Sequence, residues 1–226
     1  MATSAPRSAK LSDYNKKRDF ALTPEPRGKV AKMRTAAAGP IFVVQKHAAS
    51  RLHYDFRLEH KGVLLSWAVP KGPSIRVGER RLAMRTEDHP LDYATFEGII
   101  PEGEYGGGRV LVWDFGTWQV EGDAERQVRA GRLTFALQGK KLKGRFHLVR
   151  GRSEGGRERW LLFKGRDEGA QDADIVEERP QSVLSGKTID EVEGPVWHAQ
   201  RAAKKKAPRG AKAAGSKKLH SAARGR

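Results

Sequence analysis

The chain of 226 residues contains no cysteine, so disulfides and thiolate metal sites are excluded, and any metal ion must bind nitrogen and oxygen ligands. No apolar run approaches the length of a transmembrane helix, and the N-terminus has no hydrophobic signal segment. These absences predict a soluble protein of a reducing compartment that does not enter a membrane.

Acidic residues are unevenly distributed. Residues 200–226 hold ten Lys and Arg and no acid, and residues 1–40 hold nine Lys and Arg against three acids. The remainder, 41–199, is almost neutral, with twenty-five Lys and Arg against twenty-four Asp and Glu. Basic arms on a balanced core favour a polyanionic partner such as nucleic acid, although they can also serve solubility alone.

Composition predicts three parts. We expect 1–40 to be a basic N-terminal arm, because it is polar and because its segment from Arg18 to Gly28 contains two prolines that favour an extended chain. Residues 41–195 should form the folded domain. Residues 196–226 are rich in Lys, Ala and Gly and bury too little apolar surface to fold, so we expect a disordered tail.

Long helical patterns are also scarce, and short alternating segments separated by Gly-rich or charged turns predict β-strands instead. One short helix is expected from Thr188 to Val192, where "TIDE" has the spacing of a capping box. The pattern is typical of a closed antiparallel barrel or a sandwich. The expected strands are 41–45, 51–59, 63–69, 80–87, two short strands within 108–122 around a bend at Asp114–Gly116, 132–139, 144–150 and 159–165.

The segment "QKHAASRLHYDFRLEH" places a polar row on one of these strands. Alternate residues of a strand share a face, so His53, Asp55, Arg57 and Glu59 point one way, opposite an apolar face. With His47, a bend could complete a set of two imidazoles and a carboxylate, which suits Mn, Co or Zn. Arg57 suits a phosphate oxygen. A solvated strand face explains the same row equally well.

Two other loops carry candidate residues. His89 lies in "EDHPLDY" before a proline, and Lys71 lies in the rigid loop "WAVPKGPS". In isolation, each fits an ordinary solvated loop residue. The glycine-rich segment "PEGEYGGGRV" lacks the lysine and the spacing of a P-loop and predicts a turn.

Longer motifs carry a resemblance. The segments "FVVQKHAASRLHYDFRLEHKGVLLSWAVPKGPS", "RTEDHPLDYATFEGIIPEGEYGGGRVLVWDFGTW" and "LLFKG", with "KRDFALTPEP" upstream, closely resemble the 3′-phosphoesterase module of bacterial DNA ligase D. The resemblance covers Tyr14 to Val192. It implies a compact closed antiparallel β-barrel with little helix, flanked by extended or disordered basic arms. It also implies an enzyme that removes a 3′-terminal ribonucleoside and then the 3′-phosphate from DNA ends, leaving 3′-OH.

The resemblance also implies residue roles. The metal ligands would be His47, His53 and Asp55, holding Mn²⁺ or another divalent ion such as Co²⁺ or Zn²⁺. The residues at the reacting phosphate would be Arg57 and His89, with Lys71, Arg81 and Tyr93 at further active-site positions. The residues that handle the ribonucleoside would be Arg18, Asp19, Glu25, Gln45 and Glu87, and the N-terminal arm would be partly ordered over the site.

The resemblance further implies the setting. The partners would be DNA 3′ ends, the Ku end-binding protein and a separate DNA ligase, because the polymerase and ligase modules of ligase D have no counterpart in this sequence. A monomer in the bacterial cytoplasm, at the nucleoid and acting in repair by end joining, is expected.

The expected reaction is metal-assisted phosphoryl transfer to water, with His89 either stabilising charge on the phosphoryl group or protonating the leaving oxygen. Two alternatives stay open at this point. The His-x-Asp of "HYD" also fits a non-heme iron oxygenase on a β-barrel, with His89 or His147 as the distal ligand. A non-catalytic scaffold for DNA ends is the other alternative.

Overall fold

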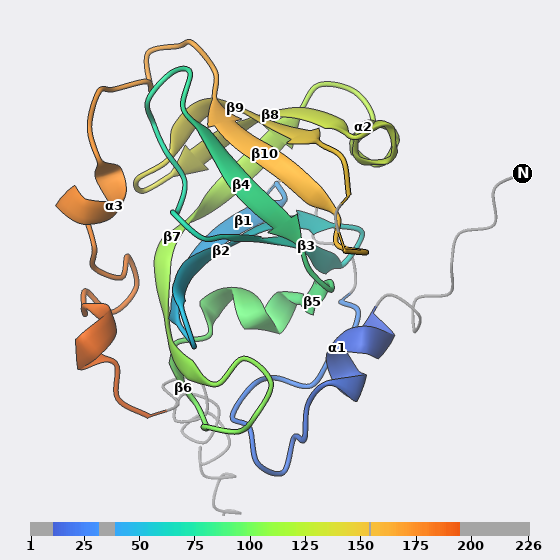
Figure 1. The fold of residues 1–226 in the computed structure, drawn as a ribbon, viewed down its shortest axis with the longest axis vertical. Helices are drawn as coiled ribbons and strands as arrows, with labels where there is room; N and C mark the ends of the chain where they lie inside the picture. Colours follow the sequence, from blue (N-terminus) through green and yellow to red (C-terminus); the bar gives the residue numbers. More distant parts are fainter. Residues whose placement is uncertain (1–10, 32–38, 154, 195–226) are drawn as a thin grey trace, which may run out of the picture.

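The computed structural model describes residues 11–31, 39–153 and 155–194. Eight antiparallel strands form a closed ring in the order β1-β2-β3-β4-β10-β9-β8-β7, and the pairing of β1 with β7 closes it (Figure 1). The expected antiparallel β-barrel is therefore confirmed. The ring strands are β1 Ile41–Ala48, β2 Leu52–His60, β3 Val63–Val69, β4 Arg80–Arg85, β7 Gly108–Val120, β8 Arg132–Gly139, β9 Lys143–Arg150 and β10 Arg159–Lys164. Two short strands lie outside the ring, β5 (His89–Pro90) beside β3 and β6 (Gly98–Ile100) beside β7.

The helices are short. In the described part of the chain they are α1 Ser12–Lys16, η3 Leu91–Thr95, α2 Ala124–Ala130, α3 Ile175–Glu178 and η4 Ile189–Glu191. The predicted capping box is present at η4, where Thr188 and Glu191 bond reciprocally, although the turn is a 3₁₀-helix. Helix α2 was not predicted from the sequence. It begins after Asp123, whose side chain accepts from the backbone N of Arg126, and ends at Gly131, which is in the left-handed conformation.

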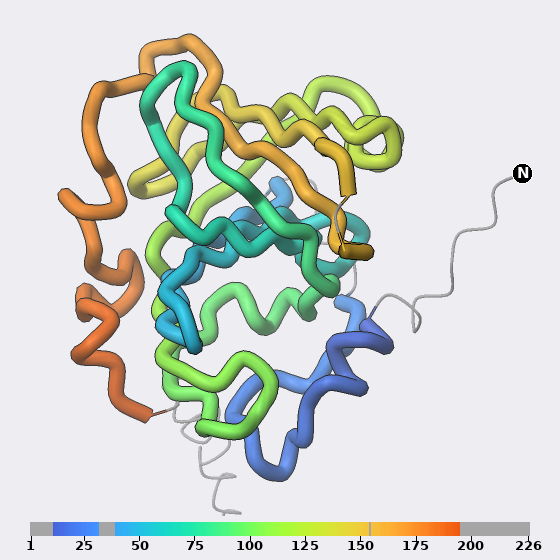
Figure 2. Tube along the Cα trace, in the orientation of Figure 1, coloured from blue at the N-terminus to red at the C-terminus, as the bar shows by residue number. Residues whose placement is uncertain are grey.

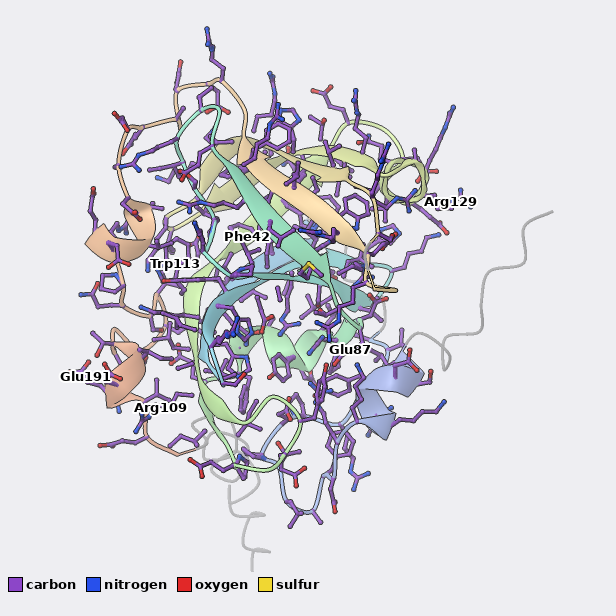
Figure 3. The ribbon with its side chains drawn as sticks, viewed as in Figure 1. Phe42, Glu87, Arg109, Trp113, Arg129 and Glu191 are labelled. Atoms are coloured by element: carbon purple, nitrogen blue, oxygen red, sulfur yellow. The ribbon has the colours of Figure 1, made fainter. Side chains whose placement is uncertain are left out.

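Large aromatic side chains fill the barrel interior. Phe56 lies 5.9 Å from Phe135 across the barrel and 6.5 Å from Trp67, measured between ring centroids. Trp67 in turn meets Trp160 edge to face at 5.8 Å. Phe42, labelled in Figure 3, is fully buried in the same cluster. Phe56 and Leu58 of β2 therefore lie in the barrel interior, and the polar row of β2 faces outward.

Strand β7 differs from its prediction. The sequence predicts two short strands around a bend at Asp114–Gly116, but β7 is one continuous strand of thirteen residues. Only a glycine fits at position 116 of this strand, because the Cβ of any other residue would come within 2.1 Å of the Gln138 carbonyl oxygen of β8. The irregularity is a register shift against β1, between Val44–Asp114 and Gln45–Val112, which leaves Trp113 as the extra residue of a bulge.

The outward face of β1–β3 is covered. Figure 1 shows η3 beneath these strands, on the side away from β8–β10, and α1 lies to one side of it. Asp55, Arg57 and Glu59 are consequently buried on β2, so the polar row is not a solvated strand face. Glu59 has a structural contact, since its carboxylate accepts from the backbone N of Ile41 at the start of β1 (2.9 Å).

The N-terminal segment 11–31 packs against the barrel. The Tyr14 hydroxyl donates to the Pro26 carbonyl oxygen (2.7 Å), which folds the segment back on itself, and the backbone N of Ala31 donates to the Gly62 oxygen (3.1 Å). Figure 2 shows this segment, in dark blue, running beside the green loop between β6 and β7. Among the described residues, no helix is long and apolar enough to span a membrane. The tail at 196–226 lies outside the described residues.

Candidate metal centre and active site

The register of β1 and β2 brings the three predicted metal ligands together. His47 lies directly opposite His53, and Gln45 lies opposite Asp55, so the side chains share the outward face. The centroids of the two imidazole rings are 4.7 Å apart. One ligand atom from each of His47, His53 and Asp55 falls within 4.8 Å of the others, so they form a candidate metal site.

Backbone carbonyls orient both imidazoles. His47 Nε2 lies 2.8 Å from the Gly106 oxygen and His53 Nδ1 lies 2.9 Å from the Arg51 oxygen. A carbonyl only accepts, so these nitrogens carry the hydrogens. The other nitrogens, His47 Nδ1 and His53 Nε2, face Asp55 at 3.5 and 3.7 Å with their lone pairs free for a cation. The donor set, its geometry and its tautomers therefore fit a divalent transition metal.

The carboxylate of Asp55 is held in its charged form. Burial alone would raise the pKa of Asp55, but the positive charge of Arg57 lowers it, and the net pKa lies well below the usual value. Arg57 Nη2 donates to Asp55 Oδ2 at 2.9 Å. Asp55 is thus an anionic oxygen ligand across the physiological pH range.

Arg57 is a fixed cation at the centre of the site, with 2% of its surface exposed. Its Nε donates to Gln45 Oε1 and its Nη1 to Ser66 Oγ, both at 2.9 Å. Gln45 is itself held by the carbonyl oxygens of Tyr93 and Phe96. Three of the five guanidinium N–H groups are used in these bonds and the one to Asp55, so two remain for a ligand.

Ser66 also belongs to the candidate site, although it was not predicted from the sequence. It lies opposite Arg57 in the β2–β3 register and is fully buried. Its hydroxyl donates to the Leu64 oxygen (2.9 Å) and lies 3.4 Å from His89 Nδ1. The available signal was a lone hydroxyl in the apolar strand "VLLSWAV", directly across a hairpin from the arginine.

The N-terminal segment supplies a second arginine. Arg18 Nη2 lies 3.3 Å from His89 Nε2, and Arg18 Nη1 lies 3.4 Å from the Glu87 carboxylate. Glu25, 3% exposed, bonds Arg18 Nε at 2.8 Å and also accepts from Thr23 Oγ1. Glu87, labelled in Figure 3 between the barrel and α1, also pairs with Lys17 (3.1 Å). Four predicted substrate residues, Gln45 included, therefore surround the same site.

His89 is a neutral imidazole in this setting. Burial lowers its pKa well below the usual value, and the positive charges of Arg57 and Arg18 lower it further. Its Nδ1 donates to the Glu87 backbone oxygen (2.9 Å), which leaves Nε2 as an acceptor for Arg18. The rings of Tyr14 and Tyr93 pack edge-on against it at 5.0 and 4.9 Å.

Other predicted residues lie further out. Tyr93 is buried beneath Arg57, whose guanidinium carbon is 5.0 Å from the ring centre, so Tyr93 forms a wall of the site. The carboxylate of Asp19 is exposed and accepts from the backbone N of Ala21. Lys71 is exposed in the turn after β3. Arg81 lies on β4 and pairs with Glu79 at 2.9 Å, one strand beyond β3.

His147 does not join the cluster. It lies on β9, where its Nδ1 is 3.0 Å from Thr134 Oγ1 and its ring packs on Phe163. The histidine that completes the candidate ligand set with His53 and Asp55 is His47. The turn "PEGEYGGG" also contributes, because Gly106 orients His47 and Tyr105 lies within 3.2 Å of Lys17 Nζ.

Comparison with known families points in one direction. Residues 45–150 match the family described as the DNA Ligase D 3′-phosphoesterase domain. The matched range begins within β1 and ends at the last residue of β9, so it contains the three candidate metal ligands, Arg57 and His89.

Individual relatives agree. The chain is 51% identical over 188 residues to the multifunctional non-homologous end joining protein LigD of Pseudomonas aeruginosa, covering 81% of this chain and 22% of that protein. It is 46% identical over 160 residues to the multifunctional non-homologous end joining DNA repair protein LigD of Mycobacterium tuberculosis, covering 71% and 20%. It is 39% identical over 170 residues to its counterpart in Mycolicibacterium smegmatis, covering 73% and 22%. The chain thus spans about a fifth of the length of the curated relatives it matches.

Proposed function

Because the chain belongs to the DNA ligase D 3′-phosphoesterase family, we propose that it is a metal-dependent phosphoesterase that heals DNA 3′ ends. Its two reactions are removal of a 3′-terminal ribonucleoside and removal of the resulting 3′-phosphate. In the first, water adds to phosphorus and the bond to the ribonucleoside 5′ oxygen breaks. In the second, water adds again, the bond to the DNA 3′ oxygen breaks, and inorganic phosphate and a 3′-OH result.

The observation that carries the proposal is the convergence of a metal-ligand set and two buried arginines on one face of the barrel. His47, His53 and Asp55 would hold the metal ion, with Mn²⁺ as the proposed ion and Co²⁺ or Zn²⁺ as alternatives. A bound divalent ion polarises a phosphoryl oxygen and lowers the pKa of water. A phosphate bound here would face positive charge from several directions.

Arg57 would bind and orient the reacting phosphate. Its guanidinium is already fixed by Gln45, Ser66 and Asp55, so little side-chain entropy is lost when its two remaining N–H groups meet phosphoryl oxygens. Gln45 acts through Arg57 in this scheme, since its amide is used up by Arg57 and two backbone carbonyls. Its effect on the substrate is therefore indirect.

His89 would act after it gains a proton. Stabilising a phosphoryl oxygen or protonating the leaving oxygen both require the imidazolium, whereas the free site holds the neutral form. A bound phosphate brings negative charge between Arg18 and Arg57 and so offsets the two charges that depress the pKa of His89. Substrate binding would thereby switch His89 to its active form.

The N-terminal segment would position the ribonucleoside. Arg18 reaches His89 from this segment, and Glu25 and Glu87 hold Arg18 in place. Carboxylates and a guanidinium suit sugar hydroxyls and the bridging phosphate. Asp19 shapes the turn that follows Arg18. Lys71 and Arg81, which lie further out, would attract the DNA backbone by charge, and Tyr93 would support Arg57.

The biological setting follows the relatives, whose names place them in non-homologous end joining. We propose DNA 3′ ends as the substrate of this chain, in the bacterial cytoplasm at the nucleoid. Ku and a DNA ligase are the proposed partners, and a monomer is the proposed state.

A primer–template assay tests the activity. One primer ends in 3′-phosphate and the other in a single ribonucleotide, each incubated with and without Mn²⁺, and the products are separated by electrophoresis. We expect Mn²⁺-dependent release of phosphate from the first, and conversion of the second to a 3′-phosphate and then to 3′-OH. The matched variants are His53→Ala, which should be inactive, and His147→Ala, which should keep activity at saturating substrate. Primers that stay intact in the presence of Mn²⁺ would contradict the proposal. Turnover of 2-oxoglutarate by the iron-loaded protein would favour the oxygenase instead.

A further inference from the structure

Strands β4, β8, β9 and β10 present a second face on the outside of the barrel. Their register aligns outward side chains in rows across the strands, one of which runs Thr134, His147, Phe163, Arg80. We call this set of side chains the outer basic face. Its members are Arg132, Thr134, Ala136 and Gln138 on β8, Lys143, Arg145, His147 and Val149 on β9, Arg159, Leu161 and Phe163 on β10, and Arg80, Leu82 and Met84 on β4.

The outer basic face carries charge of one sign. None of its positions holds Asp or Glu, while five hold Arg or Lys. The side chains of Arg80, Arg132 and Arg145 are exposed. The pKa of His147, at the centre of the face, is lowered first by burial and then by the charges of Arg145, Lys164 and Arg132, which is what a positive potential does to an imidazole.

Flat rings lie among these cations. The His147 ring packs on the Phe163 ring with centroids 5.0 Å apart and planes 30° from parallel, and the Arg80 guanidinium carbon lies 5.8 Å from the Phe163 centroid. Both rings are partly exposed. In Figure 1, α2 lies at one end of this face, and no other described helix covers it.

A hollow of about 850 Å³ opens on the same face, with Thr134, Arg145 and His147 in its lining. Two carboxylates border it. That of Asp167 is engaged by Lys164 and by the backbone N of Gly169, and that of Glu121 lies beyond the end of β7. The hollow therefore offers one cation, Arg145, and the ring of His147 to a ligand, and the other cations of the outer basic face lie outside it.

We propose that the outer basic face binds a single strand of nucleic acid, separately from the phosphoesterase site. Proteins that bind single strands combine a positively charged groove, which follows the phosphates, with rings on which bases stack. Arg80, Arg132 and Arg145 supply the charge, and His147 with Phe163 supplies the rings. A duplex keeps its base faces stacked inside, so the rings select an unpaired strand.

The location gives the proposal its meaning. The candidate phosphoesterase site occupies the outward side of β1–β3, whereas the outer basic face lies on β4, β10, β9 and β8, the next strands around the barrel (Figure 1). A strand bound there does not occupy the catalytic cluster. The barrel would thus hold an unpaired strand on one side while a 3′ end is processed on the other.

Circular oligothymidylate is the probe, because it has no 3′ end and no base pairs. Binding to the full chain is measured by fluorescence anisotropy over a range of salt concentrations. Arg80→Gln with Arg145→Gln should weaken binding several-fold and make the log–log salt slope shallower by about 1.4, since each phosphate contact on a single strand contributes about 0.7. The matched control, Lys16→Gln with Lys187→Gln, removes two cations from α1 and the C-terminal segment and should leave the slope unchanged.

Ring stacking has its own comparison. His147→Ala should weaken binding of circular oligothymidylate and leave binding of inorganic polyphosphate, which has no bases, unchanged. If the double arginine variant misfolds, Arg132→Gln alone repeats the test with an expected slope change of about 0.7. If the arginine variants kept the wild-type salt slope, the proposal would be wrong, and an acidic protein would be the ligand to test next on the outer basic face. If His147→Ala weakened binding of circular oligothymidylate and of polyphosphate equally, His147 would not stack on bases.

Discussion

Arg18 and His89 meet across 71 residues of sequence, with Arg18 Nη2 at 3.3 Å from His89 Nε2. The contact joins the N-terminal segment to the strand that follows Glu87. Because Nδ1 of His89 donates to a carbonyl, Nε2 receives the hydrogen bond, and the cation of Arg18 opposes protonation of the ring. The segment therefore adds to burial and to the charge of Arg57 in keeping a histidine of the candidate active site neutral.

The first prediction concerns this histidine. In the free protein, NMR titration of the imidazole signals should give His89 a pKa well below 6.5, because burial, Arg57 and Arg18 all favour the neutral ring. Arg18→Gln removes one of these charges and should raise the pKa of His89 towards its usual value. Activity that needs the imidazolium should then persist to higher pH. His147 serves as the internal reference, since Arg18 does not contribute to the lowering of its pKa. If the pKa of His89 were the same in Arg18→Gln as in the wild type, Arg18 would have no effect on the protonation of His89.

The second prediction concerns the metal. His53→Ala removes the more exposed imidazole of the candidate site and should weaken Mn²⁺ binding about 100-fold or more, because ligand shells are sensitive even to changes in their outer partners. Calorimetric titration with Mn²⁺ measures this without substrate, and both phosphoesterase activities should fall together. His147→Ala is the control and should bind Mn²⁺ as the wild type does. Full turnover of His53→Ala in saturating Mn²⁺ would dismiss the ligand assignment.

The third prediction concerns Glu25, which holds Arg18 through a buried ion pair of 2.8 Å. Glu25→Ala should slow ribonucleoside removal about tenfold or more, since loss of about 1.4 kcal/mol in positioning has that effect, and should change 3′-phosphate removal far less. Parallel time courses on the two primers measure the difference. Asp13→Ala, an exposed acid on α1, is the control. Equal loss of both activities would mean that Glu25 supports the fold or the metal site.

The fourth prediction concerns packing at the end of β8. A Cβ on Gly139 would lie 2.4 Å from Asp114 Oδ2 and 2.6 Å from Phe42 Cζ, so Gly139→Ala should lower the free energy of unfolding by about 1–3 kcal/mol. Urea unfolding measures the change. Gly151→Ala meets only the Arg159 oxygen at 3.8 Å and should be close to neutral. Equal stability of the two variants would show that β8 moves away at little cost.

Much of this fold could be predicted from local pattern. The strand ending at Gly139, the hairpin at Lys61–Gly62 and the capping box at Thr188 depend on residues close in sequence, and the structure has all three. The run through Asp114–Gly116 could not be predicted in this way. Its turn-like residues sit in a continuous strand because Asp114 accepts from the backbone N of Lys141 and Leu142, partners twenty-seven and twenty-eight residues away.

In the candidate site, too, local pattern predicted some features, and others depend on contacts between distant parts of the chain. The alternation of His53, Asp55 and Arg57 placed them on one face, and the hairpin register aligned His47 with them. Pattern alone left the row equally suited to a solvated face, because its burial depends on η3 and the N-terminal segment. The contributions of Ser66 and Gly106 are visible only when the strands and the 101–107 turn are assembled.

The docking of the N-terminal segment has a consequence for folding. Arg18 and Lys17 are made early during synthesis, but their partners Glu87, His89 and Tyr105 follow about seventy to ninety residues later. Barrel closure likewise waits for β7 to reach β1, a contact of long sequence separation that slows folding. A nascent chain therefore emerges with this segment undocked, and Arg18 can meet His89 only after the first four strands of the barrel have been made. The first part of the candidate site to be made therefore waits for partners that are made much later.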